Sequence, residues 1–118
     1  MLKTFDSLSD ETLLEIANQM MNDLMDASTH MDYERHIQHF SRRAKSILDE
    51  TQFKVVCGVY QEKMGTFTDR EFIGLFRRPD SIAVIWKQHY SKVAGDYVAE
   101  MVMIIEDNQY RVDHAFVF

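Results

Sequence analysis

The spacing of apolar residues changes once along this chain, near Arg70, and this change constrains the fold more than any other feature. Before Arg70, apolar side chains recur at the spacing of helices that bury one face. After Arg70 they tend to alternate with polar residues, which is typical of strands that bury one face of a sheet. The pattern predicts an α+β fold in which helices come first and an antiparallel sheet follows.

Local signals predict where three helices begin and end. Ser9 and Asp32 can each accept hydrogen bonds from free N–H groups at a helix start, and Thr51 is the expected N-cap of the third helix. Gly65 suits a left-handed C-terminal cap after Met64. The predicted helices cover about residues 10–27, 32–49 and 51–64.

Two turn signals divide the second half of the chain into two hairpins. Pro79-Asp80 suits a turn between the first two strands, and Asp107-Asn108 tolerates the positive φ values of a tight hairpin. The predicted strands cover residues 71–77, 82–90, 97–105 and 110–118.

A two-residue loop at Asp107-Asn108 would set the register of the second hairpin and assign its side chains to faces. The expected pairs on one largely apolar face are Ile105 with Tyr110, Met103 with Val112, Met101 with His114, Ala99 with Phe116, and Tyr97 with Phe118. The other face would carry Glu100, Val102, Ile104, Arg111, Asp113, Ala115 and Val117.

Length and composition predict one domain over residues 1–118, because 46% of the residues are hydrophobic and there is one proline. The start of the chain lacks a basic and then apolar leader, and no apolar run approaches the roughly 18 to 20 residues of a membrane span. A cytoplasmic location without membrane contact is therefore expected. Cys57 is the only cysteine, which excludes an intramolecular disulfide.

Charge and motifs argue against several function classes. The net charge of -6 opposes attraction to phosphate, so nucleic acid is not expected as a partner. No phosphate-binding glycine loop, nucleophile elbow or zinc-binding helix is present. His36 and His39 are three residues apart, but no third ligand lies nearby in sequence, so neither a metal nor a cofactor is predicted.

Four segments carry a resemblance to a known family. They are Glu-Lys-Met-Gly at 62–65, Ala-Val-Ile-Trp-Lys at 83–87, Tyr-Val-Ala-Glu-Met-Val at 97–102 and Gln-Tyr-Arg-Val-Asp-His-Ala at 109–115. With the order of elements, they resemble the cystatin-like α+β fold of the nuclear transport factor 2-like superfamily, and its small bacterial members in particular. The resemblance implies helices packed on a curved four-stranded sheet, with a cone-shaped cavity for a small apolar ligand.

The leading functional hypothesis is a non-catalytic binding or interaction module, because the predicted cavity face is rich in aromatic and methionine side chains. The expected ligand-binding residues are Trp86, Tyr97, Met101, Tyr110 and His114. One alternative is an isomerase or dehydratase of a small apolar molecule, with His114 and Tyr97 as proton-transfer groups. Another is an acidic inhibitor of a basic protein, which rests on the net charge alone.

The resemblance also predicts a homodimer, because sheets of this kind often pair through their outer faces. Val102, Ile104 and Val117 would form the apolar centre of that interface.

Overall fold

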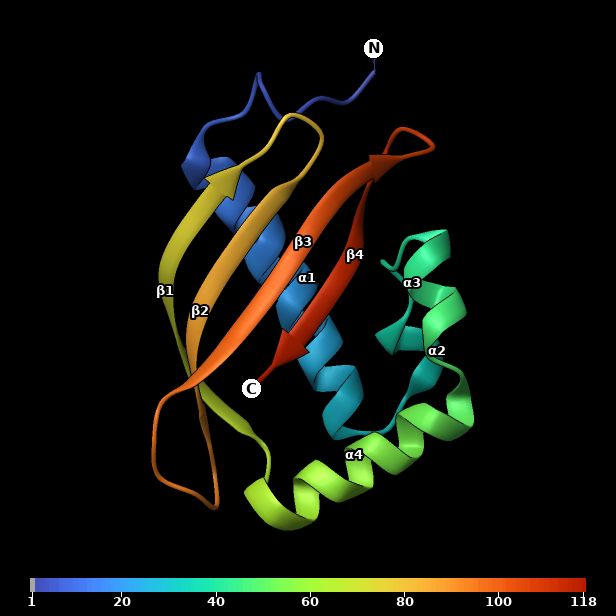
Figure 1. Ribbon diagram of the computed structural model, residues 1–118, viewed down its shortest axis with the longest axis vertical. Coiled ribbons are helices and arrows are strands. Elements are labelled where there is room, and N and C mark those ends of the chain that lie inside the picture. Colours follow the sequence, from blue (N-terminus) through green and yellow to red (C-terminus); the bar gives the residue numbers. More distant parts are fainter. Residues whose placement is uncertain (1) are drawn as a thin grey trace.

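Four helices precede four strands in the computed structural model, which describes residues 2–118 (Figure 1). The helices pack against a four-stranded antiparallel sheet, which confirms the predicted α+β class. The elements are α1 (Asp10–Thr29), α2 (Tyr33–His36), α3 (Arg42–Ile47), α4 (Glu50–Met64), β1 (Phe67–Arg77), β2 (Ile82–Tyr90), β3 (Tyr97–Glu106) and β4 (Gln109–Val117).

The first helix begins where the sequence predicts. The Ser9 hydroxyl accepts a hydrogen bond from the Thr12 N–H, and Asp10 and Glu11 stand at the positive end of the helix dipole. The helix continues to Thr29, two residues beyond the expected end. Across residues 2–118, no helix combines the length and apolar character needed to cross a bilayer.

The prediction of one helix over 32–49 is wrong, because the chain leaves the helical path between α2 and α3. The Ser41 N–H donates to the Val112 carbonyl at 2.9 Å, and the Val112 N–H donates to the His39 carbonyl at 2.7 Å. Phe40 thereby forms an isolated parallel bridge with Val112 on β4. These long-range bonds compensate for the lost helical ones, and Ser41 then caps α3.

The predicted third helix is confirmed as α4, with a different N-cap. Asp49, not Thr51, caps it through a reciprocal pair of hydrogen bonds with Gln52. The helix ends at Gly65, as expected, with φ of 87°. A Cβ atom there would lie 2.1 Å from the Ser91 Oγ, so the turn into β1 requires glycine.

The four strands follow one another in the sheet in sequence order, and every neighbouring pair is antiparallel. The predicted turn at Asp107-Asn108 is present, with positive φ values of 53° and 56°. Pro79-Asp80 form a bend between β1 and β2, where the Arg78 N–H donates to the Ser81 carbonyl at 2.9 Å. The first strand begins at Phe67, four residues before its predicted start.

The predicted register of the last hairpin holds only near the turn. Ile105 pairs with Tyr110 and Met103 with Val112, but Asp113 is an extra residue in β4 that forms a β-bulge. Beyond the bulge, every side chain of β4 lies on the face opposite to the predicted one. The observed pairs are Val102 with His114, Met101 with Ala115, Glu100 with Phe116, and Ala99 with Val117.

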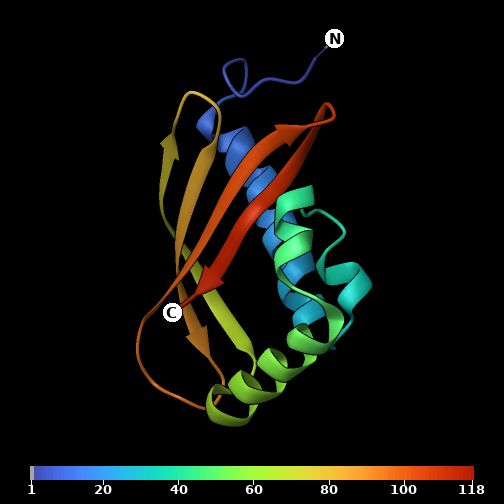
Figure 2. The same cartoon turned by 45° about the vertical axis from the view of Figure 1, so that its right-hand side comes forward.

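The core lies between α1 and one face of the sheet, which form two layers in Figure 2. Leu13, Ala17 and Met21 of α1 are buried in one cluster with Val84 and Met103 of the sheet. The remaining helices lie beside β4 and across one end of the sheet (Figures 1 and 2).

Candidate functional site

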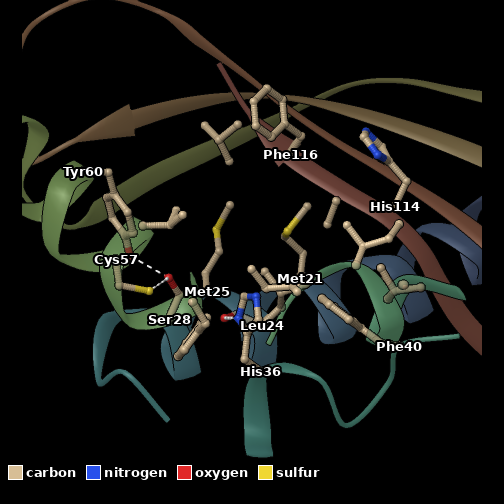
Figure 3. A pocket seen from close by; sticks show the side chains of 18 of the residues that line it. Met21, Leu24, Met25, Ser28, His36, Phe40, Cys57, Tyr60, His114 and Phe116 are labelled. Carbon is tan, nitrogen blue, oxygen red and sulfur yellow. Dashed lines mark hydrogen bonds between the residues drawn. The ribbon is translucent and has the colours of Figure 1, made fainter. Parts of the chain in front are cut away.

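A cavity of about 500 Å³ lies between the helices and strand β4. Met21 and Met25 of α1 line it on one side, Phe53 and Val56 come from α4, and Ala115 comes from β4. Figure 3 shows the two methionines and Phe40 on the helical side, with Phe116 across from them. The lining is mostly apolar, which is typical of sites for small molecules.

Large apolar side chains are exposed around the opening of this cavity. Ile47 is 61% exposed, Val56 57% and Phe116 57%, and all three line the cavity. Such a cluster leaves apolar surface in contact with water, which is unfavourable unless something covers it.

A chain of hydrogen-bonding side chains lies on the helical side of the cavity. The Ser28 hydroxyl is 2.7 Å from the Tyr60 hydroxyl and 3.3 Å from the Cys57 Sγ (Figure 3). The Gln61 side-chain amide donates to the Tyr60 oxygen at 3.4 Å and to the Ser28 carbonyl at 3.2 Å. If Tyr60 donates to Ser28, the Ser28 proton points to sulfur, which is a weak acceptor.

The Cys57 thiol is a structural group in this setting. It is 2% exposed, and burial raises its pKa above the ordinary value. Because the thiolate is the nucleophilic form, the raised pKa disfavours covalent chemistry at this residue. The Tyr90 phenol also lines the cavity, and burial raises its pKa to about 12.

His36 places an ionisable ring in the apolar part of the cavity. Its Nδ1 is 3.0 Å from the Leu24 carbonyl oxygen, and its ring lies 4.5 Å from the Phe53 ring and 5.4 Å from the Phe40 ring, centre to centre. Burial lowers the pKa of His36 below its ordinary value, because the imidazolium form loses hydration. The ring is therefore neutral near pH 7.

The only arginine that lines the cavity, Arg43, is already paired. Its guanidinium contacts the Asp113 carboxylate at 3.1 Å and also donates to the Asp113 carbonyl. The Ser41 hydroxyl donates to the same carboxylate at 2.7 Å. Arg43 and Ser41 stabilise the charged carboxylate, so the pKa of Asp113 is lowered.

His114 does not pair with Met101 on the inner face of the sheet, contrary to the prediction. The bulge at Asp113 turns it to the outer face of the sheet, where its Nε2 lies 2.8 Å from the Glu100 carboxylate. It nevertheless remains among the residues that line the cavity. Tyr97 packs edge-on against Tyr90, with ring centres 5.1 Å apart. The isomerase or dehydratase hypothesis requires His114 and Tyr97 to meet at one site. In this structure they do not.

The other predicted ligand-binding residues lie away from the cavity lining. Trp86 is 1% exposed and donates to the Asn18 side-chain oxygen at 2.9 Å, while Met101 is fully buried in the core. Tyr110 lies near the N-terminal segment and donates to the Thr4 carbonyl at 3.3 Å. The five residues are not brought together, and their role in ligand binding stays a prediction.

Sequence patterns single out His36 only through its spacing from His39. The two rings turn to different partners, because His39 lies 3.2 Å from Asp23 while His36 bonds the Leu24 carbonyl. Within residues 2–118, no group of three or more histidine, cysteine or acidic side chains is arranged to hold a metal ion. The Ser28–Tyr60 contact spans 32 positions and has no local signal.

No family model and no curated protein matches this chain. Solved structures do. A protein from Thiobacillus denitrificans, named for the association domain of calcium/calmodulin-dependent protein kinase type II, matches with a TM-score of 0.64 and 10% identity over 83% of this chain and 90% of its own. A SEC-C motif containing protein from Rhodopseudomonas palustris matches with a TM-score of 0.59 and 10% identity, over 82% and 74% of the two chains.

A third structure, from Sinorhizobium meliloti and named for the polyketide cyclases, matches with a TM-score of 0.51 and 12% identity over 85% of this chain and 94% of its own. At such low identity the likeness concerns the fold alone. The chain thus shares its α+β fold with small bacterial proteins that carry different names.

Proposed function

We propose that this chain is a member of the nuclear transport factor 2-like superfamily that binds a small, largely apolar molecule in the cavity between its helices and β4. The superfamily assignment is supported by the resemblance of the sequence and by the α+β fold shared with small bacterial proteins.

The observation that carries the binding proposal is the apolar cavity itself. Its volume of about 500 Å³ lies within the range of roughly 300 to 1,000 Å³ that is common for small-molecule sites. An apolar ligand of matching shape would gain dispersion contacts with the side chains that line this cavity. The exposed Ile47, Val56 and Phe116 add to this gain, since a bound ligand would shield them from water.

The proposal is tested with N-phenylnaphthylamine, a neutral apolar dye whose fluorescence rises in an apolar environment. The wild-type protein is expected to bind the dye saturably. Ala115→Trp, which places an indole in the cavity from β4, is expected to abolish saturable binding. The matched control is Ala94→Trp, in the exposed loop between β2 and β3, which is expected to bind like the wild type.

Circular dichroism is measured on each variant, so that loss of binding is separated from loss of folding. Absence of saturable binding by the wild-type protein would contradict the proposal. Equal binding by a folded Ala115→Trp protein would also contradict it, because the dye would then occupy another surface.

A further inference from the structure

We propose that the cavity selects an uncharged apolar molecule with a hydroxyl group, and that the His36 Nε2 accepts the hydrogen bond of that hydroxyl. This inference rests on the proposed binding function and adds the chemical class of the ligand.

Hydrogen bonding assigns the two nitrogens of His36. A carbonyl oxygen can only accept, so the 3.0 Å contact with the Leu24 carbonyl requires a proton on Nδ1. In the neutral ring the proton cannot also be on Nε2, which therefore carries a lone pair. Among residues 2–118, no side chain or backbone group forms a hydrogen bond with this Nε2 atom. In Figure 3 the His36 ring lies on the helical side of the cavity near Met21 and Leu24.

The surroundings of His36 keep the ring neutral. Phe53 from α4 and Phe40 from the segment before α3 pack on it, and α1 contributes the Leu24 carbonyl. The charged or titratable side chains that line the cavity elsewhere are Cys57 and Tyr60 on α4, Arg43 on α3, Tyr90 on β2, and Asp113 and His114 on β4. None of them forms an ion pair with His36, and burial alone lowers its pKa. The Nε2 atom is thus a hydrogen-bond acceptor near pH 7.

An acceptor without a partner in an apolar cavity selects for a donor. A ligand without a donor would displace water and leave the His36 lone pair unsatisfied, which costs binding free energy. A hydroxyl supplies the missing proton without bringing a charge into the cavity.

The charges of the lining disfavour a carboxylate ligand. Among the described residues that line the cavity there is no lysine, and the single arginine, Arg43, is engaged by the Asp113 carboxylate and carbonyl. An anion placed there would lose its hydration without gaining a free cation. An alcohol is therefore preferred over a carboxylate of the same chain length.

The test compares decanol with decyl methyl ether, which has a similar apolar chain but no hydroxyl proton. Each compound competes with bound N-phenylnaphthylamine at pH 7.5. For one hydrogen bond to an acceptor that lines the cavity we expect decanol to have a Kd about fivefold lower than that of the ether. Decanoate, whose carboxylate is ionised at this pH, is expected to compete least.

His36→Phe keeps an aromatic ring between Phe40 and Phe53 but removes the acceptor. Decanol and the ether are then expected to bind equally, with the ether unchanged from the wild type. His39→Phe is the matched control, because His39 is not part of the cavity lining, and it should keep the preference for decanol.

A second measurement uses the wild-type protein, in case His36→Phe does not fold. The nitrogen resonance of the His36 Nε2 is expected to shift on addition of decanol and to stay unchanged with the ether.

Equal competition by decanol and the ether in the wild type would overturn the inference, while saturable dye binding would leave the proposed function standing. A preference for decanol that persists in His36→Phe would overturn it too, since another group would then hold the hydroxyl. If neither the dye nor the two compounds bind, the inference and the proposed function both fail.

Discussion

His36 affects both the stability of this protein and the chemistry of its cavity. Two aromatic rings pack on its imidazole, and a backbone carbonyl holds one of its two nitrogens. Burial of this ring makes its positive form unfavourable, which has a consequence for stability as well as for binding.

We expect acid to destabilise the protein through His36. Its pKa in the folded protein is lowered from the ordinary 6.5, so below pH 6.5 the unfolded chain binds a proton more readily than the folded one. The stabilisation is complete above pH 6.5 and is lost as the pH falls through the lowered pKa. Urea unfolding between pH 7 and about 5 should show a falling free energy of unfolding, and His36→Phe should show a flatter profile.

Asp113 provides an internal comparison for this experiment. Arg43 and Ser41 lower the pKa of its carboxyl below 3.8, so its stabilisation is present above pH 3.8 and is lost at lower pH. The stabilisation lost when Asp113 is protonated should be the same in the wild type and in His36→Phe. A wild-type profile as flat as that of His36→Phe between pH 7 and about 5 would show that the ring gains no proton on unfolding.

At the scale of elements, two short irregular segments position the helices beside β4, where the cavity lies. Residues 37–41 leave the helical path so that Phe40 and Ser41 can join the edge of β4. Asp113 forms the bulge in β4 and accepts hydrogen bonds from Ser41 and Arg43 on the same side. The two irregular segments are thus bonded to each other, and they hold the helices beside β4 where the cavity opens.

The turn between α4 and β1 offers a test of backbone geometry. Gly65→Ala should lower the free energy of unfolding by about 1 to 3 kcal/mol, because a side chain is strained at this positive φ and meets Ser91. Gly58→Ala is the matched control within α4, where a Cβ atom meets nothing within 4 Å. That change should raise the free energy of unfolding by about 0.5 to 1 kcal/mol. If urea unfolding showed that both substitutions change the free energy of unfolding in the same direction, this account would be contradicted.

At the scale of the whole molecule, the sheet covers the core with one face, and no element of residues 2–118 covers the other face. Val102 and Ile104 lie on the outer face as expected, whereas the bulge turns Val117 inward, so its predicted place in a dimer interface is wrong. Phe116 and Phe118 stack on each other, and both side chains are more than half exposed. The outer face therefore keeps an apolar area, and the homodimer stays a prediction.

Sedimentation velocity at increasing protein concentration tests that prediction. The wild type is expected to form dimers, and Val102→Asp should dissociate them, because a two-fold interface would bring two unpaired carboxylates together. Val55→Asp, on the exposed side of α4, is the control and should leave the dimer intact. A wild-type protein that remains a monomer at all concentrations would refute the dimer.

Much of this fold was predictable because its signals are local. The cap at Ser9, the glycine after Met64 and the turn at Asp107-Asn108 act within a few residues, and all three are present. The candidate site was not predictable, because the predicted site residues were chosen from a register without a bulge. One extra residue in β4 moved His114 to the outer face, and His36 entered the cavity through contacts with distant aromatic rings.

Local signals specify the order of helices and strands, most of their bounds and the antiparallel hairpins, since periodicity, caps and turns are properties of short segments. Tertiary structure decided the break between α2 and α3, the bulge at Asp113 and the cavity between the helices and β4. These features depend on hydrogen bonds between Ser41, Arg43 and β4, which are about 70 residues apart in the chain. No local pattern encodes such pairings, because their free energy is gained only when the two segments meet.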